Sequence, residues 1–244
     1  MSKAPGNIPH QPPKTGFAGG LKEGIGIFIG YMPIALAFGL LSKNTGLSLA
    51  HTTGMSLIVF AGASQFMALE LIAIGTGHLE IVFSTFMVNI RHLLMSMSLH
   101  ERIPRESKPR KAFAAFFVTD EVFAVASTRE GEVQSTYIYG LGIMAYLGWT
   151  IHTGIGYVAG TFLPVNLQEG MGVALYAMFI GLLVPAVHVY RKAFFLAAAA
   201  AVLNSLFGLF LPTGWAIIFA VIAAVLLFEF IGDTSSGDTE EGEE

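Results

Sequence analysis

The stretch GIGIFIGYMPIALAFGLLS fills residues 24–42 and contains no charged side chain. An α-helix needs about 20 consecutive apolar residues to cross the hydrocarbon core of a bilayer. Backbone that faces lipid must also satisfy its own hydrogen bonds, which an α-helix does within one segment. The stretch therefore predicts a membrane-spanning helix.

The rest of the chain repeats this pattern. Hydrophobic residues make up 54% of the 244 positions and charged residues only 12%, which is about half the charged share of a soluble domain. The sequence therefore predicts an all-α integral membrane protein with about eight hydrophobic helical segments. These segments cover residues 21–42, 52–74, 80–99, 112–127, 134–162, 171–190, 193–211 and 213–231.

Polar sequence lies at both ends of the chain. Residues 1–18 are Pro-rich and lack the apolar core of a signal peptide, so we expect a flexible cytoplasmic arm. Residues 233–244 are rich in Asp and Glu, which predicts an acidic, disordered tail. Between them, residues 19–232 should form a single transmembrane domain, since the connections between segments are short.

The positive charges indicate how the segments cross the membrane, because Lys and Arg are enriched in cytoplasmic loops. Loop 101–111 carries five Lys and Arg residues, yet three successive full spans from a cytoplasmic N-terminus would place it outside. The conflict disappears if segments 52–74 and 112–127 are broken and re-enter on their own side. Six full spans and two cytoplasmic termini then remain. The alternative is two ordinary spans and an exception to the charge rule.

The two segments predicted to be broken share a weak sequence echo. FAGASQ at residues 60–65 and AFFVTD at residues 115–120 each place a hydroxyl directly before a second polar side chain. Entry from opposite faces would make them the paired discontinuous helices of an inverted repeat, in which the binding site lies near the midplane.

Polar side chains inside apolar segments are the candidates for function, because burying them in lipid is costly. Arg91 lies mid-segment, and its planar guanidinium suits bidentate binding of a carboxylate. One interpretation is an anchor for a substrate carboxylate, oriented by Asn89. The alternative is an internal ion pair of Arg91 with Asp120 or Glu121.

Asp120 and Glu121 are adjacent carboxyl groups in the second broken segment, an arrangement suited to carrying a proton or meeting a substrate ammonium. Alternatively, one of them caps the N-terminus of a half-helix. In the first broken segment, an unwound turn at 62–65 would present Ser64 and Gln65 to a ligand. Its small residues also fit a helix-packing patch.

Several classes of function are excluded or disfavoured. The chain has no Cys, so disulfides and thiolate metal sites are excluded. It also lacks the zinc-protease, nucleophile-elbow and phosphate-loop motifs. We therefore expect no enzyme activity, no cofactor, no metal and no nucleic-acid partner.

The chain resembles the AzlC family, the large subunits of branched-chain amino acid exporters. The matching stretches appear in order over most of residues 16–190. They are GFAGGL from residue 16, YMPIALAFGL from 31, VFAGASQF from 59, NIRHLL from 89, VTDEVF from 118 and GLLVP from 181.

The resemblance implies a transporter domain in a bacterial inner (plasma) membrane that works with a small AzlD-like membrane subunit. The implied activity is proton-coupled secondary export of leucine, isoleucine, valine and sometimes methionine. Arg91 and Asn89 would then bind the carboxylate. Ser64 and Gln65 would add polar contacts, while Asp120 and Glu121 would take the ammonium or a proton. Phe66 and Met87 would line an apolar pocket. The alternatives are a channel or transporter for another small solute, or a structural subunit whose partner carries the substrate path.

Overall fold

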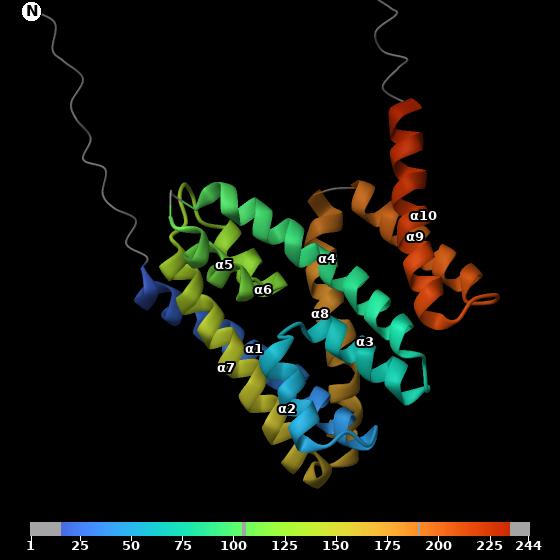
Figure 1. The fold of residues 1–244 in the computed structure, drawn as a ribbon, viewed down its shortest axis with the longest axis horizontal. Helices are drawn as coiled ribbons and strands as arrows, with labels where there is room; N and C mark the ends of the chain where they lie inside the picture. The colour runs from blue at the N-terminus through green and yellow to red at the C-terminus, as the bar shows by residue number, and fades with distance from the viewer. Residues whose placement is uncertain (1–15, 104–105, 190, 235–244) are drawn as a thin grey trace, which may run out of the picture. The chain divides into compact units, whose positions relative to one another are not determined.

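The computed structural model describes residues 16–103, 106–189 and 191–234, and within these ranges it contains helices and no strands (Figure 1). The all-helical prediction is therefore confirmed for the described part of the chain. The helices are α1 (Phe17–Asn44), α2 (Leu49–Ile58), α3 (Gly62–Ala73), α4 (His78–Arg102), α5 (Lys108–Phe116), α6 (Asp120–Ser127), α7 (Ser135–Ala159), the 3₁₀ turn η1 (Gly160–Phe162), α8 (Val165–Val189), α9 (Arg191–Phe207) and α10 (Thr213–Thr234).

The two segments predicted to be broken are each split into two short helices. Segment 52–74 becomes α2 and α3, and segment 112–127 becomes α5 and α6. The breaks lie slightly earlier than predicted, at residues 59–61 and 117–119, so 62–65 is the first turn of α3 and not an unwound turn. The physical reason lies partly at Phe60, whose φ of 44° is a left-handed conformation that a right-handed helix cannot contain.

The predicted ends fall mostly outside the described residues. Residues 1–15 of the expected arm and 235–244 of the expected tail are not described. At the inner edges, α1 already begins at Phe17 and α10 continues to Thr234.

The chain divides into two compact units. Unit 1 comprises residues 1–35 and 91–152, and unit 2 comprises residues 36–90 and 153–244. The long helices α1, α4 and α7 each contribute one part to unit 1 and another to unit 2.

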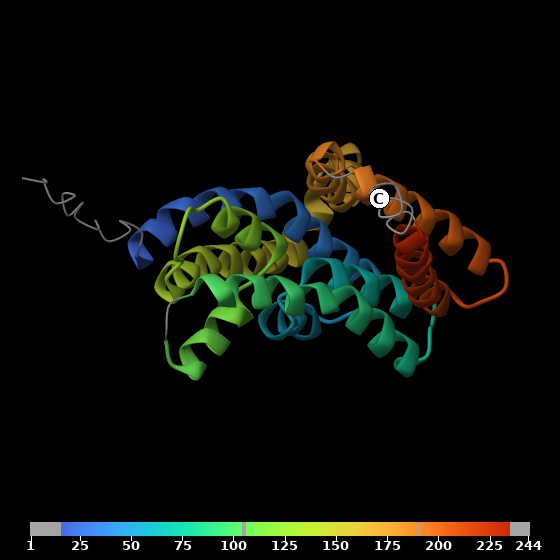
Figure 2. The same ribbon diagram turned by 90° about the horizontal axis from the view of Figure 1, so that it is seen from above.

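In unit 1, α1 and α7 run parallel and side by side, as both ribbon views show (Figures 1 and 2). Gly20 lies against the backbone of Tyr137 and Leu141, and further along Gly148 lies against the backbone of Phe28. A Cβ added at Gly20 would stand 2.1 Å from the carbonyl oxygen of Tyr137. Glycine is required here because two helix backbones touch, as they do at small-residue crossings in membrane proteins.

The remaining helices of unit 1 meet at the end where α1 and α7 begin. Arg102, at the end of α4, donates hydrogen bonds to the carbonyls of Ser127, Arg129 and Gly131, and Tyr139 of α7 donates to the carbonyl of Arg110 (2.7 Å). The start of α5 and the end of α6 therefore lie at one end of unit 1. The segment formed by α5 and α6 begins and ends there, and α4 runs antiparallel to α1 and α7.

Unit 2 repeats the close crossing of α1 and α7. A Cβ at Gly39 would stand 2.1 Å from the carbonyl oxygen of Thr153, and one at Gly156 would stand 2.2 Å from that of Leu36. At the other side of this unit, the Glu80 carboxylate of α4 accepts a hydrogen bond from the Gly214 N–H in the first turn of α10 (2.8 Å). A carboxylate at a helix N-terminus is favourable because the N–H groups there have no partner within the helix.

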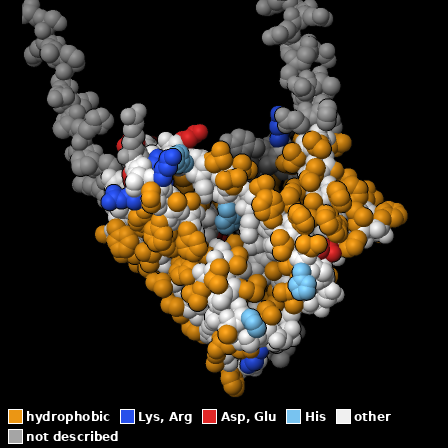
Figure 3. All heavy atoms as spheres, in the orientation of Figure 1, with side chains coloured by type: hydrophobic (Ala, Val, Ile, Leu, Met, Phe, Trp, Pro, Cys, Tyr) orange, Lys and Arg blue, Asp and Glu red, His pale blue; other side chains and the backbone are white. Residues whose placement is uncertain are grey.

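The described surface is unusually apolar. Figure 3 shows hydrophobic side chains over much of one face, with Lys and Arg atoms gathered near the end of α4. Among the described residues, the two helices Phe17–Asn44 and His78–Arg102 are long and apolar enough to cross a membrane, and Phe194–Phe207 and Thr213–Phe228 are shorter apolar stretches. Large apolar side chains point outward along α4, where a soluble helix would be polar: Leu79, Val82, Phe83, Phe86, Ile90, Leu93, Leu94 and Met97.

Candidate functional site

The break between α5 and α6 places two carboxylates at a helix N-terminus. Thr119 is the N-cap, in extended conformation, and its hydroxyl accepts a hydrogen bond from the Val122 N–H (3.3 Å). Asp120 and Glu121 form the first turn of α6, where the helix dipole favours negative charge. The cap that the sequence suggested for one of the acids is therefore provided by Thr119.

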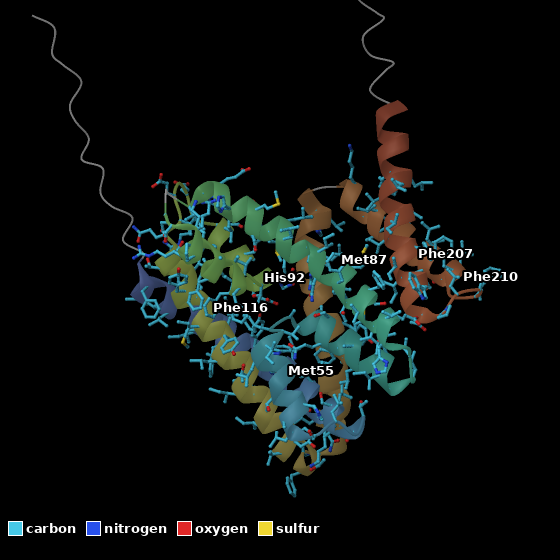
Figure 4. The ribbon with its side chains drawn as sticks, viewed as in Figure 1. Met55, Met87, His92, Phe116, Phe207 and Phe210 are labelled. Carbon is cyan, nitrogen blue, oxygen red and sulfur yellow. The ribbon has the colours of Figure 1, made fainter. Side chains whose placement is uncertain are left out.

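Arg91 of α4 forms an ion pair with Asp120, with 2.9 Å between Nη2 and Oδ2. The Arg91 side chain is 33% exposed and that of Asp120 is 19% exposed, so the pair is only partly buried. Figure 4 labels His92, the neighbour of Arg91 on α4, and Phe116, which ends α5 just before the break. Of the two interpretations of Arg91, the internal ion pair is the one present in this structure.

Tyr31 of α1 completes the cluster and was missed by the sequence analysis. Its hydroxyl contacts the Glu121 carboxylate (2.5 Å) and the Thr119 hydroxyl (2.9 Å), and its ring packs edge-on against Trp149 with centroids 5.4 Å apart. Tyr31 is only 6% exposed. The available signal was a phenol inside an uncharged stretch of the first predicted span.

The cluster joins α1, α4, α6 and α7 within unit 1. The cluster contains one cation, Arg91, and two carboxyl groups. One of the two carboxyl groups therefore has no positive charge in the cluster to balance it. Arg91 and Asp120 neutralise each other, and Glu121 is bonded to a neutral phenol. Such an arrangement can exchange a proton at Glu121 and can bind a zwitterion across the ion pair.

Asn89 lies in unit 2, two positions before Arg91 on the same helix. Residues two apart on an α-helix do not share a face. The Asn89 Oδ1 atom is buried and has no hydrogen-bond partner among the described residues. Its predicted role in orienting a carboxylate remains a prediction.

Ser64 and Gln65 are buried in unit 2, where they satisfy the backbone of the first break. The Ser64 hydroxyl donates to the Ala61 carbonyl (2.9 Å), and Gln65 Oε1 accepts from the Ala61 N–H (3.3 Å). Ala61 is the N-cap of α3 and makes no side-chain cap hydrogen bond, and these two residues instead satisfy its own carbonyl and N–H groups. Gln65 also donates to Ser56 (3.2 Å), whose hydroxyl donates to Thr153 (3.0 Å).

The two breaks are alike in form but not in detail. Thr119 is the N-cap of α6, whereas Ser64 is the third residue of α3. The echo that paired these hydroxyls is therefore out of register by three positions. The break in unit 1 carries charge, and the break in unit 2 is capped by neutral groups.

Phe66 lines a cavity of about 260 Å³ in unit 2, together with Leu41, Glu70 and Tyr176. Its ring also packs edge-on against Phe38 with centroids 5.4 Å apart. Met87 does not line this cavity, so the structure does not bring the two predicted pocket residues together there.

A second charged cluster closes the end of unit 1. Glu23 of α1 accepts hydrogen bonds from Arg129 and from the hydroxyl of Tyr137, and the Arg129 guanidinium stands 4.9 Å from the Tyr137 ring centroid. No pattern in the sequence marks these residues as functional, because polar side chains near segment ends are common at membrane interfaces.

Residues 26–163 match the model of the AzlC protein family. The chain belongs to the AzlC family. The matched range contains Tyr31, Arg91, Asp120 and Glu121, so the whole cluster lies in the part that defines the family, while α8 to α10 lie outside it. The resemblance inferred from the sequence motifs is thus confirmed.

Named relatives support a role in membrane transport. The inner membrane protein YgaZ of Escherichia coli is 29% identical, with 88% of this chain and 89% of the relative covered. An uncharacterized membrane protein of Archaeoglobus fulgidus is 31% identical, with 69% of this chain and 75% of the relative covered. The branched-chain amino acid transport protein AzlC of Bacillus subtilis is 26% identical, with 64% of this chain and 62% of the relative covered. No solved structure matches the chain.

Proposed function

We propose that this AzlC-family chain is the permease subunit of a proton-coupled exporter of branched-chain amino acids. The observation that carries the proposal is the Arg91–Asp120 ion pair at the break between α5 and α6. An amino acid carries a carboxylate and an ammonium group close together. The Arg91 cation and the Asp120 anion are complementary to these two charges. The name of the Bacillus subtilis relative supplies the substrate class.

Binding would exchange partners within the ion pair. The substrate carboxylate would take the Arg91 guanidinium, which suits a planar bidentate acceptor. The substrate ammonium would take Asp120. The free protein holds the same charges paired, so they are not left isolated when substrate is absent. Arg91 and Asp120 therefore keep their charges when the substrate binds, and neither has to gain or lose a proton.

Glu121 is the candidate for proton coupling. Asp120 is paired with Arg91, whereas the Glu121 carboxylate accepts a hydrogen bond from the Tyr31 hydroxyl. A proton on Glu121 would change its bond with Tyr31 and hence the contact between α6 and α1. Proton binding would thereby be linked to the position of the helix that also carries Asp120.

We further propose that α5 and α6 form a re-entrant hairpin open to the cytoplasm. Support comes from unit 1, where α5 begins beside the start of α7 and the end of α4, and α6 ends beside the end of α4. The first turn of α5 carries Lys108, Arg110 and Lys111, as expected of a cytoplasmic face. Arg91 lies about 16 Å along α4 from Arg102 at 1.5 Å per residue, near the middle of a core of about 30 Å.

The small AzlD-like subunit and the bacterial inner membrane belong to the same proposal. The Escherichia coli relative is named an inner membrane protein. Relatives named for transport favour a transporter over an enzyme. Copurification of this chain with the product of a neighbouring small membrane-protein gene, from native membranes, tests the partner.

The main test is efflux of labelled leucine from cells that express Arg91→Ala or Asp120→Asn. Each change breaks the ion pair and should lower export by at least about tenfold, since a charge-assisted contact is worth roughly 1.5–3 kcal/mol. Arg110→Ala is the matched control, because Arg110 is an exposed cation whose backbone carbonyl accepts the hydrogen bond from Tyr139. Normal export by both variants at wild-type protein levels contradicts the site.

Two further measurements separate the alternatives. Export that continues down a leucine gradient after the proton gradient is collapsed identifies a channel or facilitator. For topology, a Cys placed at Ser107 can be labelled cleanly, because the chain has no Cys. Labelling of Ser107→Cys by an impermeant reagent from outside intact cells overturns the re-entrant arrangement.

A further inference from the structure

A cavity of about 470 Å³ lies in unit 1 between the end of α4 and α5. Its lining is divided by chemistry. The charged or titratable lining residues are His100, Glu101, Lys108 and Lys111. The apolar, buried lining residues are Leu99, Ile103, Ala114, Val118 and Ile138. The cavity therefore has a polar, mainly basic part and an apolar floor.

The apolar floor closes the cavity toward the middle of unit 1. Leu99 and Ala114 are 1% exposed, Val118 is 2% exposed and Ile138 is fully buried. Val118 directly precedes Thr119, so the apolar lining adjoins the break that carries Asp120. The lining includes none of Arg91, Asp120, Glu121 and Tyr31, so the cavity is distinct from that cluster.

The cavity opens beside side chains suited to lipid. Met97 lines it and is 59% exposed, while Leu93, Leu94 and Phe113 on the same two helices are between 55% and 63% exposed. The apolar strip along α4 and α5 therefore leads directly to the basic residues where α4 ends and α5 begins. An occupant should combine an acyl chain with an anionic head.

We propose that this cavity binds one anionic phospholipid of the cytoplasmic leaflet, with its phosphate at Lys108 and Lys111 and an acyl chain along Met97. Charge complementarity carries the choice, because the basic lining attracts an anionic headgroup and disfavours a zwitterionic one. Basic recesses between membrane helices on the cytoplasmic side are suited to such headgroups. The site would hold α5, and so the re-entrant hairpin, against α4. It rests on the proposed orientation of unit 1 and not on the identity of the substrate.

The test uses the purified full-length chain in a neutral detergent, with added phosphatidylglycerol or phosphatidylcholine of the same acyl chains. Phosphatidylglycerol should raise the melting temperature in a saturable way and phosphatidylcholine should not. The Lys108→Gln, Lys111→Gln double variant should need at least roughly tenfold more phosphatidylglycerol for the same rise in melting temperature. The reason is that each lysine lost removes one favourable contact with the headgroup. Lys192→Gln removes an exposed lysine on α9 and serves as the control.

A second variant tests the cavity without changing charge. Ala115 lines the cavity and is exposed on α5, so Ala115→Trp fills the space from an exposed position. It should also abolish the effect of phosphatidylglycerol. Each variant is compared with its own melting temperature without lipid, because Lys111 also donates to the Ile103 carbonyl (3.3 Å).

Three outcomes overturn the proposal. Equal stabilisation by the two lipids removes the headgroup preference, and an unchanged response of the double lysine variant removes the site. The third uses Ala115→Cys and a maleimide. Protection by leucine but not by phosphatidylglycerol would assign the cavity to the substrate path. Failure of leucine export, in contrast, would leave the lipid measurements unaffected.

Discussion

The phenol of Tyr31 and the carboxylate of Glu121 are 2.5 Å apart, although the residues are separated by 90 positions in the chain. The contact ties the middle of α1 to the first turn of α6. Its surroundings are buried, with Tyr31 6% exposed and its ring against Trp149. The short helix α6, which carries both acids, is thus linked to α1 through Tyr31 and to α4 through Arg91.

Replacing Tyr31 by Phe should remove this link while keeping the packing on Trp149. We expect normal membrane insertion and leucine export slowed by roughly tenfold or more, because a hydrogen bond to a charged group contributes about 1.5–3 kcal/mol. The dependence of export on the proton gradient should also weaken. Efflux measured at several imposed gradients checks both effects.

The control for Tyr31→Phe is Tyr139→Phe, which removes another tyrosine hydroxyl from unit 1, one that donates to the Arg110 carbonyl. Equal slowing by the two changes would show that general loss of stability, and not the Glu121 contact, controls the rate.

Arg91 and Asp120 should show strong energetic coupling. Either single replacement leaves a partly buried charge without its partner, whereas the Arg91→Ala, Asp120→Asn double variant leaves neither. We therefore expect the double variant to lose less stability than the sum of the two single losses. The difference, which is the coupling free energy, should be about 1–3 kcal/mol. Thermal unfolding of the four proteins in detergent measures it. Additive effects would mean that the ion pair contributes nothing to stability.

The helix crossing in unit 1 should tolerate Ala at Gly26 but not at Gly20. A Cβ at Gly20 would overlap the backbone of α7, while no heavy atom lies within 4 Å of one at Gly26. Both residues lie on α1, so helix propensity affects them alike. We expect Gly20→Ala to lower stability by about 1–3 kcal/mol and Gly26→Ala to leave it unchanged or raise it slightly. Similar melting temperatures for the two variants would contradict the close crossing.

Gln65→Leu separates capping from substrate binding. The change keeps the side-chain size but leaves the Ala61 N–H and the Ser56 hydroxyl short of a partner. If capping is the role of Gln65, stability should fall by about 1–3 kcal/mol, and the leucine concentration for half-maximal export should stay unchanged. A shifted concentration dependence with unchanged stability would assign Gln65 to the substrate.

The sequence by itself determined the membrane class and the number of hydrophobic segments. Uncharged runs such as residues 24–42 require a helix in lipid whatever packs beside them, so the eight segments reappear as eight continuous or broken helical stretches. The family also followed from local motifs, since a motif such as NIRHLL is read without knowledge of its neighbours. The two interrupted segments were found because polar residues inside an apolar run are a local signal.

Only the tertiary structure decided which residues meet. Arg91 had two carboxylates and a substrate as candidate partners, and the choice of Asp120 depends on how α4 and α6 lie together. Tyr31 gained its role from a helix 90 positions away, a separation that no local pattern encodes. The glycines of α1 are indistinguishable in the sequence, yet Gly20 touches another backbone and Gly26 faces open space. Periodicity and composition report the environment of a segment, whereas contacts between segments depend on the relative placement of helices in space.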